Sequence, residues 1–172
     1  MAQRETHKGQ SLIRRRIIRE RVVQALYAHE IGGDAPEHVI SCVLAGLESN
    51  ALSFEFARRM FLETLEHRTE IDRILKANLG AWDLKRVAVL DRLILRLAIC
   101  ELVYFEEIPT KVSVNEAIEL AKLFSTEKSG QFVNGVLHGI LKSLTESGEI
   151  SKAGRGLYTG EAPGGHRGKP HT

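Results

Sequence analysis

The segment IPTKVSVNEAIELAKLFSTEKSGQFVNGVLHGIL, residues 108–141, decides the fold of this chain. Pro109 disfavours a helical conformation in the residue before it, and Ser113 precedes Glu116 by three residues, the spacing of a capping box. Apolar residues then recur at helical spacing on both sides of a polar break at residues 125–130. They are Val114, Ala117, Ile118, Ala121 and Phe124 before the break, and Phe132, Val133, Val136, Leu137, Ile140, Leu141 and Leu144 after it. The segment predicts a helix–loop–helix.

The same periodicity predicts helices over the rest of residues 12–145. We expect them at about 12–31, from Asp34 as a cap to about 46, at 54–79 with a break near His67, and at 84–104. The last of these is apolar nearly all round, which is typical of a central buried helix. No stretch alternates with period two for long enough to indicate a sheet. The sequence therefore predicts an all-α fold, a compact bundle of about seven helices in two packed halves, about 12–80 and 81–145.

The two ends of the chain differ from this pattern. Residues 1–11 are polar and lie in a locally basic region, so we expect a mobile N-terminal arm. Seven of the fifteen glycines fall in residues 147–172, and few apolar residues accompany them. Such a segment cannot bury enough apolar surface to order itself, so we expect 146–172 to be a disordered tail. A weak electrostatic arm is the alternative interpretation of the tail.

Composition bounds the function. The 172 residues carry a net charge of only +2 and are 43% hydrophobic, as in ordinary globular proteins. No apolar run reaches the roughly 18 residues of a membrane span, and no signal-peptide core follows the basic start, so we expect a cytoplasmic protein. The histidines are scattered, no glycine-rich phosphate loop follows a strand, and neither cysteine fits a metal-ligand spacing. We expect no enzyme activity, no cofactor and no metal.

A basic cluster opens the first predicted helix. At about 100° per residue, Arg15, Arg16 and Arg19 fall within one arc beside the apolar face, while Arg14 points to another side. Cations near a helix N-terminus oppose the helix dipole, which is easier to explain if an anion binds there. The pattern alone leaves two interpretations open: a nucleic-acid contact or a solvated charged face.

The polar break at residues 125–131 is a second candidate site. Lys122, Lys128 and Gln131 offer hydrogen-bond donors at or beside a helix N-terminus, which itself favours anions. Phe132 follows, and an exposed ring there can stack on an unpaired base. Periodicity favours the alternative, in which Phe132 belongs to the core.

Three further positions carry structural expectations. Gly135 and Gly139 lie four apart on one helix, where glycine costs about 1 kcal/mol relative to alanine, so we expect close helix packing to compensate. Glu101 falls within the apolar face of its helix. Because an unpaired buried carboxylate is very costly, we expect Glu101 to accept hydrogen bonds from Arg96 or from a nearby helix start.

Several of these stretches resemble the NusB family of transcription antitermination factors. The resemblance rests on VNEAIELAKLF with FVNGVL, on RRRIIRERVVQALY near the N-terminus and on VLDRLILRLAICEL in the central helix. It covers about residues 12–144 in the family's order. It implies a NusB-like fold and RNA binding at boxA sequences through the matching arginines, with Arg14, Arg15, Arg16 and Arg19 as the candidates. Relatives often have an acidic residue where Lys128 stands.

The resemblance also implies partners. It predicts binding of boxA-like single-stranded RNA together with NusE, a small-subunit ribosomal protein, and entry into the elongating RNA polymerase complex that transcribes ribosomal RNA. We expect Tyr27, Glu30 and Asp91 to form the NusE surface. The alternatives are a helical adaptor without RNA contact, or a regulatory domain related to RNA methyltransferases. The chain shows no α/β cofactor-binding segment, which counts against the methyltransferase alternative.

Overall fold

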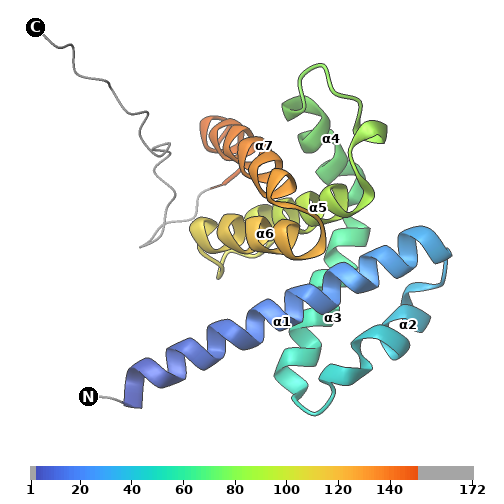
Figure 1. The fold of residues 1–172 in the computed structure, drawn as a ribbon, viewed down its shortest axis with the longest axis vertical. Helices are drawn as coiled ribbons and strands as arrows, with labels where there is room; N and C mark the ends of the chain where they lie inside the picture. Colours follow the sequence, from blue (N-terminus) through green and yellow to red (C-terminus); the bar gives the residue numbers. More distant parts are fainter. Residues whose placement is uncertain (1–2, 151–172) are drawn as a thin grey trace, which may run out of the picture.

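The computed structural model describes residues 3–150, with side chains described for residues 15–150 (Figure 1). Seven α-helices and no strand occur in this range, so the all-α prediction is confirmed. The helices are α1 (Gln3–Gly32), α2 (Pro36–Val39), α3 (Ala51–Glu66), α4 (Arg68–Asn78), α5 (Val89–Tyr104), α6 (Thr110–Phe124) and α7 (Glu127–Glu146). A π-helical turn (Ile40–Leu44) and a 3-10 turn (Ala45–Leu47) lie between α2 and α3, and another 3-10 turn spans Leu84–Arg86.

Several predicted boundaries change. Helix α1 begins at Gln3 rather than near Leu12, because the polar residues before Leu12 show no apolar periodicity from which a helix could be read. The predicted break near His67 is confirmed, since this residue separates α3 from α4. Asp34 does not cap α2; Ala35 occupies that position without a side-chain hydrogen bond. The expectation for the tail beyond residue 150 lies outside the described residues, and the division into halves at residue 80 stays a prediction.

The predicted capping box at Ser113 is wrong. Helix α6 begins one turn earlier, at Thr110 after Pro109, so Ser113 lies inside the helix and is buried. Its hydroxyl donates to Glu101 on α5 at 3.0 Å, and Glu116 pairs with Arg16 instead of reaching back to a helix start. Contacts with other helices thus occupy both side chains that the capping box would have used.

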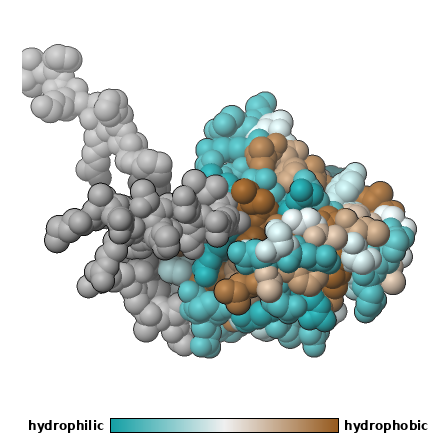
Figure 2. Space-filling view, turned by 90° about the horizontal axis from the view of Figure 1, so that it is seen from below, coloured by the Kyte–Doolittle hydropathy of each residue, from teal (hydrophilic) through white to brown (hydrophobic). Residues whose placement is uncertain are grey.

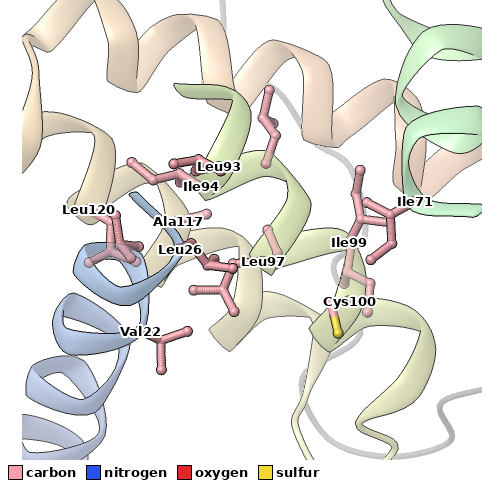
Figure 3. Close-up of a cluster of buried hydrophobic side chains, with 14 of the residues drawn as sticks. Val22, Leu26, Ile71, Leu93, Ile94, Leu97, Ile99, Cys100, Ala117 and Leu120 are labelled. Atoms are coloured by element: carbon pink, nitrogen blue, oxygen red, sulfur yellow. The ribbon is translucent and has the colours of Figure 1, made fainter. Parts of the chain in front are cut away.

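Helix α5 forms the centre of the core, as the sequence predicts. It packs against α1, α3, α4, α6 and α7, and its residues from Leu93 to Leu102 are all buried. Figure 3 shows Leu93, Ile94 and Leu97 of α5 facing Val22 and Leu26 of α1 and Ala117 and Leu120 of α6. In Figure 1, α1 crosses α3, while α6 and α7 lie side by side; α1 also contacts α5. The core thus fixes the relative positions of α1, α6 and α7, which carry the candidate site.

The glycines of α7 do not behave as expected. A Cβ at Gly135 would meet nothing within 4 Å, and one at Gly139 would make only an ordinary contact with Asn78 at 3.6 Å. The predicted close packing at these two positions is therefore wrong. The close approach is at Gly130, where a Cβ would lie 2.8 Å from Cγ of Lys122.

The surface keeps some apolar side chains in solvent. Ile17, Ile31 and Leu52 are among the exposed large hydrophobic residues. Figure 2 shows one face, on which hydrophobic patches alternate with hydrophilic ones. Within residues 3–150, no helix has both the length and the apolar character needed to cross a bilayer.

Candidate RNA interface

The basic edge of α1 consists of Arg15 and Arg16. Both side chains are exposed. Arg16 donates from Nε and Nη2 to the Glu116 carboxylate of α6, at 3.1 and 2.9 Å, and this hydrogen bond raises its pKa. The Arg15 guanidinium lies 5.3 Å from the centre of the Phe56 ring. The side chain of Arg14 lies outside the described residues.

Arg19 does not belong to this edge, and the prediction that it does is wrong. Its side chain is 1% exposed and forms two hydrogen bonds to Glu101, at 2.7 and 2.8 Å. Burial lowers the pKa of Arg19, but the hydrogen bond and charge of Glu101 outweigh it, so the pKa is raised. At about 100° per residue, buried Val23 extends the apolar arc of α1 beyond Arg19. That extension is the signal in the sequence that places Arg19 inside.

Glu101 therefore has partners other than the expected Arg96. It accepts from the Arg19 guanidinium of α1 and from the Ser113 hydroxyl inside α6. Arg96 instead binds Asp72 of α4, at 2.8 and 3.0 Å. The buried charges thus join α1 to α5 and α4 to α5.

The second candidate site lies at the bend between α6 and α7. Thr126 caps α7 by accepting from the Ser129 backbone N–H at 3.2 Å. Lys122, Lys128 and Gln131 are exposed. The stem of Lys122 lies over Gly130, and its ammonium is 3.4 Å from Glu119. This packing holds the Lys122 side chain beside the bend.

Phe132 is half-buried and lies against the core. Its position is therefore compatible with both interpretations, a core residue and a ring that stacks on a base. Its ring centre is 6.3 Å from that of Trp82, with the ring planes tilted by 47°. Trp82 is 64% exposed. Sequence reasoning missed Trp82 as a site residue, because nothing in the linear pattern places residue 82 beside residue 132.

Helix α6 connects the two basic regions. Arg16 reaches α6 at Glu116, and Lys122 lies six residues further along the same helix, a rise of about 9 Å. Arg16 and Lys122 therefore both lie along α6, with Glu116 and Glu119 beside them, whereas Arg15 lies on α1 against Phe56 of α3. The arrangement can bind a polyanion at several points at once.

The residues predicted for the protein partner are only partly available. Tyr27 is 43% exposed. Glu30 is held by three arginines of α4 and α5, namely Arg68 at 3.4 Å, Arg92 at 3.3 Å and Arg96 at 3.6 Å. Asp91 is buried, so the prediction that it forms part of an exposed contact surface is wrong. Its Oδ2 accepts from the Ser129 hydroxyl at 3.1 Å, and burial raises its pKa, which that hydrogen bond opposes.

One group of side chains in the described range has donor atoms that could hold a metal. Glu63, Glu66 and His67 each offer an atom, and these atoms lie within 4.8 Å of one another. The His67 ring stacks on Tyr104 at 3.8 Å and contacts Glu63 at 3.1 Å. These contacts account for the position of His67 without an ion.

Comparisons with known proteins agree with this architecture. The model of the NusB family matches residues 16–142. The transcription antitermination protein NusB of Salinibacter ruber is 45% identical over 144 residues, which are 83% of this chain and 90% of that protein. NusB of Bacillus mycoides is 42% identical over 132 residues, 77% of this chain and all of that protein. A chain in the crystal structure of antitermination factors NusB and NusE in complex with dsRNA superposes with a TM-score of 0.69 at 27% identity, over 76% of this chain and 97% of that one. The chain therefore belongs to the NusB family.

Proposed function

We propose that this chain is an RNA-binding transcription antitermination factor. It binds boxA-like single-stranded RNA together with NusE and joins the elongating RNA polymerase complex in the cytoplasm, supporting ribosomal RNA transcription. The family supports this role, since its relatives are named for transcription antitermination and one solved structure contains NusB, NusE and RNA. No catalytic step is part of the proposal.

The observation that supports RNA binding is the set of exposed cations on α1 and at the α6–α7 bend. Arg15 and Arg16 lie on α1, where Arg16 contacts α6, and Lys122 and Lys128 lie at the bend. Arg16 has to exchange Glu116 for a phosphate, and because the Glu116 side chain is only 13% exposed, the loss of this partner opposes part of the gain from the phosphate contact. Glu116 and Glu119 dilute the positive potential, so binding by the isolated chain should be modest.

Single-stranded RNA is favoured over duplex by the aromatic residue beside the bend. Phe132 lies four residues after Lys128, so the two fall on the same side of α7. A ring beside a cation suits an unpaired base and its phosphate, whereas a duplex keeps its bases stacked. The solved complex of the relative contains double-stranded RNA, so both forms belong in the test.

NusE supplies the second part of the proposed interface. Tyr27 is the exposed residue of the predicted partner surface, and tyrosine combines a large contact area with a polar tip. Glu30 positions α1 against α4 and α5 rather than offering a free charge. Asp91 is buried and offers no exposed contact to NusE.

The test is a titration of the chain with fluorescently labelled boxA-like RNA, single-stranded or duplex, with and without NusE. We expect binding to the single strand that weakens with salt and that tightens when NusE is present. Binding of NusE without any RNA affinity, alone or in the complex, would instead identify a protein adaptor.

A further inference from the structure

Trp82 lies on the surface in a fixed turn between α4 and α5. Gly80 adopts a positive φ of 61°, and the Trp82 backbone N–H donates to the Leu79 carbonyl at 3.2 Å. The indole is 64% exposed and contacts Phe132 at the start of α7. It is the chain's single tryptophan. Core packing explains the buried part of Phe132 but leaves most of the Trp82 ring without a partner.

The geometry of the two rings leaves aromatic surface available. Their centres are 6.3 Å apart and their planes are tilted by 47°, so neither ring covers the face of the other. Flat contacts with an aromatic face are what an unpaired base makes, and they tolerate any base because every base has a π face. Two rings from separate elements can receive one base or two adjacent ones.

The charges around these rings favour a nucleic acid over a protein. Lys85 and Arg86 are exposed just after Trp82, and Lys128 lies one turn before Phe132. Two carboxylates are near in sequence: Asp83, which accepts from the Lys85 backbone N–H at 3.0 Å, and Glu127, which is 3.9 Å from Lys122. Protein interfaces are depleted in lysine, whereas single-strand binding sites combine aromatic rings with cations.

We propose that Trp82 and Phe132 form a two-ring stacking surface for unpaired bases of the bound RNA, with Lys85 and Lys128 beside the adjacent phosphates. The inference rests on the proposed RNA binding and names the part of the chain that holds bases. It extends the RNA site from α1 and the α6–α7 bend to the α4–α5 turn.

Intrinsic fluorescence tests the inference directly, because Trp82 is the only indole. An unlabelled single-stranded RNA of about twelve nucleotides with a boxA-like sequence should quench or shift the emission of the wild-type chain. Labelled RNA then gives affinities. Trp82→Ala should bind about 5- to 150-fold more weakly, the range expected for one lost base stack. Trp82→Phe should recover most of this affinity, and the salt slope of Trp82→Ala should match wild type because no charge is removed.

Leu52→Ala is the matched control, since Leu52 is an exposed apolar residue at the start of α3. It should bind RNA like wild type. If wild type binds RNA with unchanged emission and Trp82→Ala binds equally well, the stacking surface is refuted while the proposed function stands. If NusE alters the emission and RNA does not, the rings contact protein and the inference falls. If no RNA binds wild type in any condition, the proposed function and the inference fail together.

Discussion

The buried ion pair between Arg19 and Glu101 makes a stability prediction that the sequence alone would not give. The two side chains are 1% and 2% exposed, and the Ser113 hydroxyl also donates to the Glu101 carboxylate, at 3.0 Å. Arg19→Met keeps the apolar stem and removes the guanidinium, so the Glu101 charge stays buried without its arginine partner. Removing one partner of such a pair costs about 3–5 kcal/mol. For a chain of this size that corresponds to a fall in Tm of roughly 6–20 °C.

Urea unfolding followed by circular dichroism measures this loss. The double variant Arg19→Met with Glu101→Leu should recover most of it, because an apolar pair of similar volume is often as stable as a buried ion pair. Arg16→Met is the matched control, since the Arg16 side chain is 45% exposed and the loss of its pair with Glu116 should therefore cost less than the loss of the buried pair. If Arg19→Met unfolds within about 1 kcal/mol of wild type with the same m value, the pair does not hold α1 to α5 as described.

Three further predictions concern α7 and its surroundings. Gly130→Ala should destabilise the chain, because the new Cβ would lie 2.8 Å from the Lys122 side chain, whereas Gly135→Ala has open space and should raise the free energy of unfolding by up to about 1 kcal/mol. Thermal unfolding of both variants tests this, and equal changes in Tm would contradict the packing described at Gly130. Burial raises the pKa of Asp91, so the folded state holds this proton more tightly than the unfolded chain and loses stability as pH rises above the ordinary carboxyl pKa. The free energy of unfolding of Asp91→Asn should therefore rise relative to that of wild type as the pH increases from about 3 to 7. A difference between the two that stays constant over this range would argue against a raised pKa. Lys128→Asp should weaken RNA binding more than it lowers Tm, most clearly at low salt, and equal affinity there would remove the bend from the site.

The helices could be predicted because their apolar residues repeat every three to four positions. That regularity identified α5 as the central helix and located the break at His67. It failed at Gln3, where polar residues continue α1 without any such repeat. It also failed at Ser113, because a capping box is a local pattern and the buried carboxylate of Glu101 offered a tertiary partner instead.

The candidate site was harder to predict, since exposure depends on how helices pack. The sequence identified Arg15, Arg16 and Lys128 as charged positions, and the structure leaves them exposed. Arg19 groups with them only if Val23 is left out of the helical projection, and its guanidinium lies inside against Glu101. Trp82 could not be linked to Phe132 by any linear spacing, because their contact depends on α4 and α7 meeting in the fold.

The salt dependence of RNA binding tests the central claim most directly. Wild type, Arg15→Gln with Arg16→Gln, and the control Arg21→Gln, whose exposed side chain belongs to another side of α1, are titrated with labelled boxA-like RNA at several salt concentrations with NusE present. Each lost phosphate contact should reduce the slope of log affinity against log salt by about 0.7, so the double variant should lose roughly 1.4 while the control keeps the wild-type slope. A folded double variant with the wild-type slope, or a wild type whose RNA affinity ignores salt, would contradict the claim that the exposed arginines of α1 bind RNA.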